Sequence, residues 1–365
     1  MSIAQQQQAP GTGLLDRPVV GAADIAAAED GLAAVLGYAG DVVLVQAEAI
    51  VALEATARSL GRPGLAALNV TTGPYGALFG RWLAASGTEV TDLAVPFSRT
   101  VTAADVRQVL GSAHFDLVAV VHAEAATGGA NPMAEIAALV ADHGALLVVD
   151  AVASVGAHPV DPTGWSADVV AVGPQKALAG PAGVSALTIS SRAWDAMRRN
   201  PAAPRESILS LLDLKDGWLA GGRTAVPGTP SSLETAALNQ ALARVQQEGL
   251  DAVIARHRAA AAATRAGLRA LGLAPWIADD RAAAGVVTTL AASDSRLLSA
   301  ARAAGARLLT AAPGSLATTT LRVNHTGRAA QLPVVLHEIR SLATALGQSD
   351  AAAVTAAERA WHAAG

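Results

Sequence analysis

Short apolar segments that alternate with helical stretches run through the middle of the chain and constrain its fold most strongly. Most are continuous apolar runs, as expected for strands that are buried on both faces of a sheet. The predicted strands are Val42–Val45, Leu65–Val70, Leu117–His122, Ala145–Asp150, Asp168–Val172 and Val184–Ser190. Helical periodicity lies between them at Ala47–Leu60, Gly76–Ala85, Ala103–Leu110 and Ala134–His143. The sequence therefore predicts an α/β fold with a doubly wound, mainly parallel sheet.

The pattern changes after Ser190. A loop-rich stretch follows, and a long helical stretch then opens at Ser231, where Ser231-x-x-Glu234 predicts a capping box. It continues to about Leu271 and is broken near Gly249. The remainder mixes predicted strands and helices in the manner of a small α+β domain: Gly285–Leu290, Ser295–Ala304, Thr318–Val323 and Leu332–Leu346.

We divide the chain into three parts on this basis. The glutamine-rich residues 1–13 are predicted to be a disordered leader, residues 14–245 a large domain, and residues 246–365 a small C-terminal domain. A length of 365 residues agrees with about two domains.

Composition excludes several classes of function. A net charge of −4 without a basic cluster argues against nucleic-acid binding, and no apolar run is long enough to span a membrane. The chain has no cysteine, which excludes disulfides and thiol nucleophiles and fits a cytoplasmic protein. The eight histidines form no HExxH motif and no close pair, so no metal site is predicted.

Lys176 is one of only two lysines in the chain, whereas 24 residues are arginine. It follows a buried-looking strand, where desolvation activates an amine as a nucleophile; an arginine in the same place would stay protonated. Asp150 ends a similar strand 26 residues upstream. Because ligands of open α/β sheets bind beyond the carboxyl ends of the strands, the two side chains are expected to face one crevice. A salt bridge across a loop is the alternative explanation of the pair.

The segments around these two residues resemble the class V aminotransferases, which are pyridoxal phosphate (PLP) enzymes of fold type I. The central match is Val148-Val-Asp-Ala-Val-Ala-Ser-Val-Gly156 followed by Asp168-Val-Val-Ala-Val-Gly-Pro-Gln-Lys-Ala177. Shorter matches keep the family's order at Gly73-Pro-Tyr-Gly76, His122–Gly128, Leu212–Lys215, Thr229-Pro230 and Leu321-Arg-Val323. The resemblance extends over roughly residues 40–345, and the alanine–glyoxylate and serine–pyruvate aminotransferases are the most similar branch.

The resemblance implies a role for each residue around the cofactor ring. Lys176 would hold PLP as an internal aldimine and would move a proton between the substrate α-carbon and the cofactor. Asp150 would pair with the pyridine nitrogen and keep it protonated. Tyr75 would stack on one face of the ring and Val152 would pack on the other, although both residue types are also common in protein cores.

The resemblance also implies a phosphate site at a helix N-terminus, formed by Ala47, Glu48 and Ala49. Gln175, and Thr229 of a partner subunit, would add side-chain donors in the family arrangement. Glu48 departs from the usual Gly/Ser/Thr-rich turn and brings negative charge towards a phosphate dianion, unless its side chain simply points into solvent.

Further departures concern Pro174, Val226 and Asn324, which stand where the family usually has a small hydroxyl residue, an aromatic residue and a glycine. Of the properties that the resemblance implies, binding of PLP is therefore the one that these residues support least.

The substrate side of the site is implied by Arg322, which resembles the arginine that holds the substrate carboxylate with a bidentate fork. A solvated surface arginine is the alternative. His122 and Thr127 would lie in the loop near the ring, and His122 could equally be a core histidine.

The predicted function is a PLP-dependent aminotransferase that acts as a homodimer on a small amino acid and a 2-oxo acid such as glyoxylate or pyruvate. Two alternatives stay open. The same lysine, aspartate and cofactor support β-elimination by a C–S lyase, and a degenerate PLP fold could serve as a non-catalytic binding protein.

Overall fold

A computed structural model describes residues 18–226, 228–292 and 295–365 of the chain. The predicted leader, residues 1–13, lies outside the described residues.

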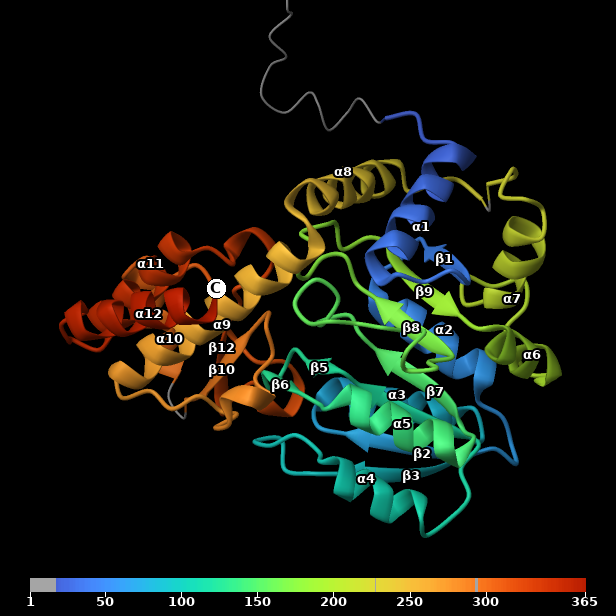
Figure 1. Cartoon of the computed structure of the whole chain (residues 1–365), viewed down its shortest axis with the longest axis horizontal. Helices are drawn as coiled ribbons and strands as arrows, with labels where there is room; N and C mark the ends of the chain where they lie inside the picture. The colour runs from blue at the N-terminus through green and yellow to red at the C-terminus, as the bar shows by residue number, and fades with distance from the viewer. Residues whose placement is uncertain (1–17, 227, 293–294) are drawn as a thin grey trace, which may run out of the picture.

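The large sheet has seven strands in the order β1-β9-β8-β7-β4-β2-β3 (Figure 1). β9 is antiparallel to both of its neighbours, and every other pair is parallel. The carboxyl ends of the six remaining strands therefore lie at one edge of the sheet. The strands are β1 (Asp41–Val45), β2 (Ala66–Thr71), β3 (Glu89–Ala94), β4 (Leu117–Val121), β7 (Leu146–Asp150), β8 (Val169–Val172) and β9 (Ser185–Ile189).

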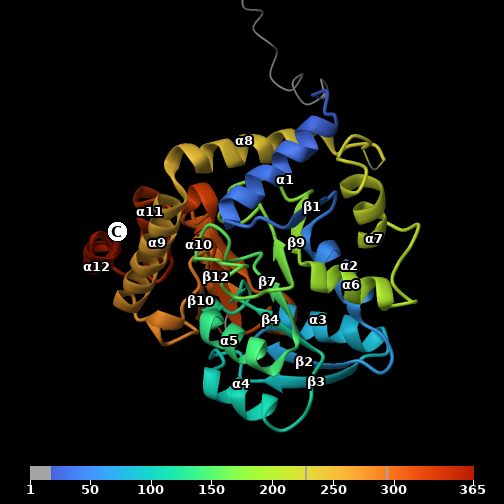
Figure 2. The same ribbon diagram turned by 45° about the vertical axis from the view of Figure 1, so that its right-hand side comes forward.

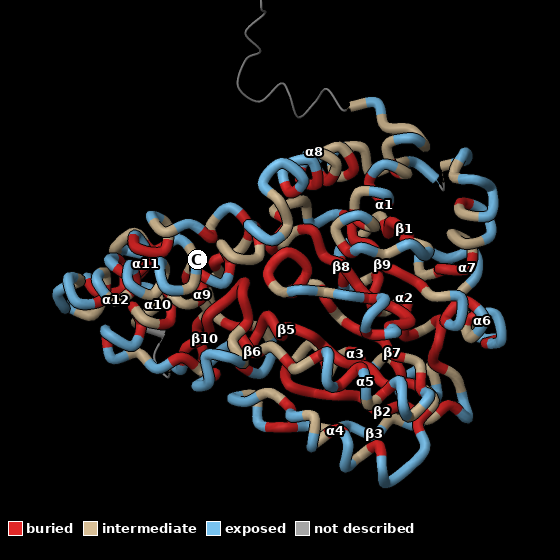
Figure 3. Tube along the Cα trace, viewed as in Figure 1, coloured by how far each residue is buried: buried red, intermediate tan, exposed pale blue. Residues whose placement is uncertain are grey.

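Helices cover both faces of this sheet, as the doubly wound pattern predicts (Figure 2). One face packs against α1 (Ala22–Leu36), α4 (Ala103–Leu110), α5 (Met133–His143) and α8 (Ser232–Glu248). The opposite face packs against α2 (Ala49–Leu60), α3 (Pro74–Ala85), α6 (Ser191–Arg199) and α7 (Leu211–Asp213), which a π-helical turn, Leu214–Leu219, continues. Except for the edge strand β3, the strands between them are buried along almost their whole length (Figure 3).

The C-terminal region, residues 250–364, has a core of its own. A three-stranded antiparallel sheet in the order β10-β12-β11 packs against four helices. The chain turns into this region at Gly249, whose φ of +85° suits glycine. The elements are α9 (Leu250–Ala270), β10 (Thr288–Ala291), α10 (Ser295–Ala303), β11 (Leu309–Ala311), β12 (Thr320–Val323), α11 (Leu332–Ala345) and α12 (Ala351–Ala364), with short 3-10 turns at Asp280–Ala282, Gly314–Leu316 and Gly327–Ala329. The exact domain boundary at residue 245 stays a prediction.

The six predicted strands of the large sheet and the four predicted helices between them are confirmed to within two residues. The structure adds the elements α1, β3, β11 and α12, which were not predicted. β3 is an edge strand that exposes Glu89, Thr91 and Asp92, so it lacks the continuous apolar run of the inner strands. The alanine-rich helix α1 has weak contrast between an apolar and a polar face, which hides its periodicity.

The predicted capping box at Ser231 is wrong, although α8 does begin at the next residue. The Ser231 side chain makes no capping hydrogen bond, and its backbone N–H donates to Gln46 Oε1 at 2.6 Å. The Glu234 side chain packs against Gly183, where an added Cβ would lie 2.6 Å from Glu234 Cγ. Tertiary contacts have thus replaced the local cap.

None of the helices in the described ranges is long and apolar enough to cross a membrane. The same ranges contain no group of three or more side chains that could hold a metal ion.

A buried histidine fixes the start of α9 against the turn after β12. His257 is fully buried; its Nδ1 donates to the Val253 carbonyl at 2.7 Å, and its Nε2 accepts the Gly327 N–H at 2.9 Å. A ring nitrogen that accepts an N–H bond cannot also carry a proton. Burial lowers the pKa of His257 to about 4, so the folded protein keeps this ring neutral well below pH 6.5.

We expect His257→Leu to make the free energy of unfolding less sensitive to pH between 6.5 and about 4. In the wild type, the unfolded chain binds a proton at His257 below its ordinary pKa while the folded chain does not. This histidine therefore costs stability as the pH falls, reaching about 3 kcal/mol at the lower limit. Urea unfolding across this range measures the slope, with the exposed His362→Leu as the control. Equal slopes for wild type and His257→Leu would contradict the argument.

Candidate active site

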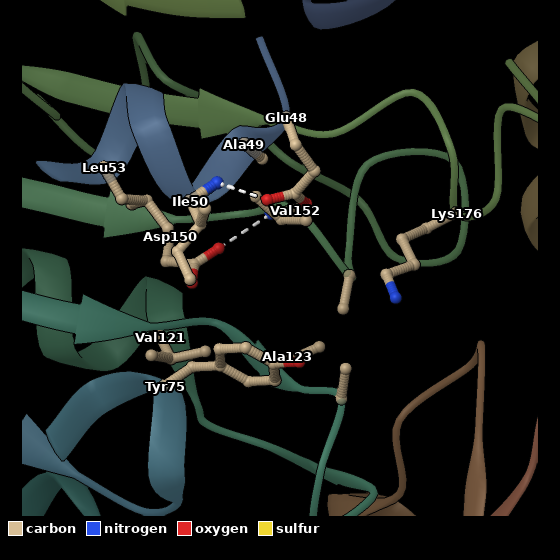
Figure 4. A pocket seen from close by; sticks show the side chains of 12 residues that line it. Glu48, Ala49, Ile50, Leu53, Tyr75, Val121, Ala123, Asp150, Val152 and Lys176 are labelled. Carbon is tan, nitrogen blue, oxygen red and sulfur yellow. Dashed lines mark hydrogen bonds between the residues drawn. The ribbon is translucent and has the colours of Figure 1, made fainter. Parts of the chain in front are cut away.

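A cavity of about 200 Å³ opens at the edge of the large sheet where the parallel strands end (Figure 4). Segments that are far apart in sequence converge on it: the start of α2, the start of α3, the loops that follow β4 and β7, and the loop after β8. Its lining residues are Glu48, Ala49, Ile50, Leu53, Tyr75, Val121, Ala123, Ala125, Asp150, Val152, Ala153 and Lys176.

The cavity has the form of a slot with opposite charges at its two ends (Figure 4). Asp150 lies at one end and the Lys176 amine points into the other, while Tyr75 and Val152 form the two walls between them. Lys176 and Asp150 therefore face one crevice, as their positions after neighbouring strands predict. A flat aromatic ring fits between walls of this kind.

Asp150 is held by the backbone that follows it. Its Oδ1 accepts the Val152 N–H at 3.0 Å, so the residue that forms one wall also orients the carboxylate. Burial raises the pKa of Asp150 to about 6; the Val152 hydrogen bond opposes this rise, and the Glu48 charge adds to it. The other carboxylate oxygen remains available to a ligand.

Lys176 is half-buried, and burial lowers the pKa of its amine. The positive charge of Arg322 lowers it further, whereas Glu48 and Asp150 act in the opposite direction. A lowered pKa increases the fraction of neutral amine, the form that attacks a carbonyl and accepts a proton.

Glu48 is the N-cap of α2 and occupies the position predicted for an anion. Its Oε2 accepts the Ile50 N–H at 2.7 Å, and its Oε1 accepts from Gln175 Nε2 at 2.8 Å. The side chain is thus tied to its surroundings at both oxygens. A carboxylate stands where a helix N-terminus and a side-chain amide would otherwise receive a phosphate.

Five residues that were predicted to bind the cofactor or the substrate lie outside the cavity lining of this chain: Ala47, Thr127, Gln175, Thr229 and Arg322. Thr229 lines a separate groove with Gln46 and Ala47. Thr127 is buried, and its Oγ1 accepts the Gly129 N–H at 3.3 Å. Arg322 lies directly behind the wall, where its Nη1 donates to the Ala125 carbonyl at 3.0 Å and its buried Nε has no partner. Tertiary structure thus brings Arg322 to the site's border.

His122 is also a core residue in this structure. Its ring is buried and lies edge-on to Trp165, with ring centroids 5.2 Å apart.

Glu124 is a residue that sequence reasoning missed. It is completely buried beneath the start of α3, and burial raises the pKa of its carboxyl to about 7. The available signal was a single carboxylate within the small apolar run Ala123-Glu-Ala-Ala126. A carboxylate is almost never fully buried unless it has partners.

Comparison with known proteins decides the family. The family model described as Aminotransferase class-V matches residues 25–298. The chain belongs to the class V aminotransferase family. It is therefore an enzyme, a PLP-dependent aminotransferase with the fold-type I architecture, as the sequence resemblance implies.

Individual relatives agree with this membership. The chain is 36% identical over 311 residues to a pyridoxamine–pyruvate transaminase of Mesorhizobium japonicum, covering 84% of this chain and 77% of the relative. The crystal structure of a pyridoxamine–pyruvate aminotransferase from Mesorhizobium loti superposes with a TM-score of 0.86 at 33% identity, over 94% of this chain and 88% of the other. An alanine–glyoxylate aminotransferase from Nostoc sp. gives 0.83 at 25% identity, over 92% and 91%.

The residues of this aminotransferase fit the ring of PLP better than its phosphate. Asp150, Lys176 and the two walls match the nitrogen, the aldehyde and the faces of the ring. At the phosphate end, Glu48 would have to leave the Ile50 N–H and Gln175 before a phosphate could take its place.

We expect Asp150→Asn to weaken binding of pyridoxal by about ten- to a hundredfold, because the amide cannot supply a charge-assisted bond to the ring nitrogen. In the wild type, the affinity should fall as the pH drops through about 6, where Asp150 gains a proton. Equilibrium dialysis of pyridoxal measures both effects, with Asp195→Asn on the exposed face of α6 as the control. An unchanged affinity in Asp150→Asn would contradict the role of this carboxylate.

Proposed function

We propose that this aminotransferase moves an amino group onto a small monocarboxylic 2-oxo acid, with pyruvate and glyoxylate as the acceptors. The observation that carries the proposal is the slot between Tyr75 and Val152, with Asp150 at one end and Lys176 at the other (Figure 4). The relatives' names supply the acceptor class: pyruvate for the Mesorhizobium proteins and glyoxylate for the Nostoc protein.

The residues that line the cavity would have separate roles in the reaction. PLP supplies the electron sink for the carbanion when it is bound. Lys176 would hold the cofactor, and its Nζ would take the proton from the substrate α-carbon and deliver it to the cofactor. Asp150 would pair with the ring nitrogen and keep it protonated, and Tyr75 and Val152 would enclose the two faces of the ring.

The substrate end favours a small molecule with one carboxylate. Ala123, Ala125 and Ala153 line the cavity with small apolar side chains. Arg322 donates a hydrogen bond to the Ala125 carbonyl in this wall. Its guanidinium would bind a single substrate carboxylate. Among the described residues that line the cavity, Lys176 is the single cation, so a second substrate carboxylate would find no partner there.

We also propose that the enzyme acts as a cytoplasmic homodimer. Thr229 lines a groove other than this cavity, which agrees with a role in the site of a partner subunit. The absence of cysteine agrees with a reducing compartment.

Glu48 favours a second candidate for the amino donor. The first candidate is a small amino acid, with PLP retained as the cofactor. The second is pyridoxamine itself, the donor in the names of the Mesorhizobium relatives. Pyridoxamine lacks the phosphate, so its ring could enter the slot while Glu48 stays bonded to Ile50 and Gln175.

Lys176→Ala is expected to lower the rate of transamination by at least about 10²–10⁴-fold, the usual contribution of an acid–base group. Assays pair L-alanine or pyridoxamine with glyoxylate or pyruvate and vary both substrates. Lys215→Ala, which removes the other lysine, is the matched control. Parallel double-reciprocal lines support transamination with an amino acid donor. Release of pyruvate and ammonia from one amino acid would favour the β-eliminating lyase instead, and full activity in Lys176→Ala would overturn the proposal.

Glu48→Ser is expected to tighten binding of PLP by about tenfold or more, because it removes a negative charge next to the phosphate and keeps a capping oxygen on α2. Fluorescence titration with PLP and with pyridoxal measures the change. Glu89→Ser on the exposed edge strand β3 is the control. Wild-type preference for pyridoxal over PLP supports pyridoxamine as the donor, and the reverse preference supports an amino acid. No change of PLP affinity in Glu48→Ser would contradict the charge argument.

A further inference from the structure

Glu124 connects two parts of the active site that come from opposite ends of the chain. It lies in the short strand β5 (Ala123–Glu124), which pairs with β6 (Gly129–Ala130) immediately after β4. Its side chain is completely buried and reaches the beginning of α3, the helix that carries Tyr75. No residue assigned to the chemistry above explains why a carboxylate should be buried there.

The first connection runs to Tyr75. Glu124 Oε2 accepts the Gly76 N–H at 3.5 Å, so the carboxylate meets the free N–H groups of the first turn of α3. Gly73 makes this approach possible, since a Cβ at that position would lie 2.2 Å from Glu124 Cγ. The carboxylate thereby fixes the turn from which the Tyr75 ring enters the slot.

The second connection runs to Arg322. Glu124 Oε1 accepts the Ala126 N–H at 3.2 Å, which holds the turn after β5. The carbonyl of the intervening residue, Ala125, receives Arg322 Nη1, and the Ala126 carbonyl receives Thr289 Oγ1 at 3.2 Å. One buried side chain therefore supports both the wall of the slot and the docking point of the arginine.

We propose that Glu124 is a positioning residue that holds Tyr75 and Arg322 in the relative placement needed to bind the oxo acid. The proposal rests on the substrate roles given to these two residues above. Both contacts are with N–H donors, and an ionised carboxylate accepts with both oxygens, whereas a protonated one must donate with one of them. The site is therefore fully assembled only when Glu124 is charged.

The surroundings of Glu124 place this ionisation near neutral pH. Burial raises the pKa of Glu124 to about 7, the Ala126 N–H opposes the rise, and the charge of Asp150 on β7 adds to it. Arg322 on β12 and Tyr75 on α3 also face the carboxylate and interact with it electrostatically. As the pH falls through this value, the contact to Gly76 or to Ala126 is lost.

Glu124→Gln tests the proposal, because its amide can accept with one atom only and leaves one backbone N–H without a partner. We expect the KM for pyruvate to rise by about tenfold with a smaller change in kcat. The acidic limb of kcat/KM near pH 7 should disappear, while a limb from Asp150 near pH 6 remains. Glu124→Asp keeps the carboxylate and should keep the limb; it also covers the case in which the glutamine variant does not fold.

Glu338→Gln is the matched control. Glu338 is equally buried and accepts from the backbone N–H groups of Arg307 and Leu308, far from the cavity. Both N–H groups donate to Glu338 Oε2, which the oxygen of a glutamine amide can replace, so this variant should change neither KM nor the pH profile. If Glu124→Gln behaves in the same way, the role of Glu124 is structural and the proposal is overturned.

Binding of pyridoxal, followed by quenching of protein fluorescence, separates this proposal from the proposed function. If the wild type binds pyridoxal but does not transaminate, the substrate assignment fails and the binding experiment still decides. Weaker binding in Glu124→Gln that no longer changes near pH 7, and still falls near pH 6 where Asp150 is protonated, supports positioning of Tyr75. Identical binding and identical pH dependence in wild type and variant would overturn it.

Discussion

The parallel pairing of β7 with β4 and β8 is the constraint on which the site depends. The pairing sets Asp150 opposite Val121 on one side and Ala171 on the other. Parallel strands end at a common edge, so the loops that leave them converge although they are far apart in sequence. Asp150 and Lys176 reach opposite ends of one slot for this reason, and the continuous apolar strands behind them make the edge rigid.

The N-termini of two helices are the second feature that shapes the site. α2 and α3 both begin at this edge, and each presents free N–H groups to it. In each case a carboxylate of the chain accepts a hydrogen bond from one of these N–H groups: Glu48 at α2 and Glu124 at α3. One is at the mouth of the cavity and the other is buried, so their consequences differ. Glu48 is proposed to control what binds beside α2, and Glu124 is proposed to position the wall that carries Tyr75.

Much of this architecture was predictable from residue patterns. The inner strands are continuous apolar runs, and Lys176, Asp150, Tyr75 and Val152 were identified from their positions beside strand ends and from the family resemblance. Prediction failed where the local pattern is weak or overridden. The edge strand β3 is polar, and the alanine-rich helix α1 has little contrast between its faces. The Ser231 N–H donates to Gln46 of another element, and the Ser231 side chain forms no local cap.

The sequence by itself determined the fold class, the family and four of the residues that line the cavity, because periodicity and strand-end positions are local properties. Only the tertiary structure decided what those groups contact. It tied Glu48 to Ile50 and Gln175, placed Arg322 against Ala125 and set Thr229 in a separate groove. It also buried Glu124 between two elements. The hydrogen bond from Arg322 to Ala125 joins residues 197 positions apart, and it depends on how the layers pack, which no local pattern records.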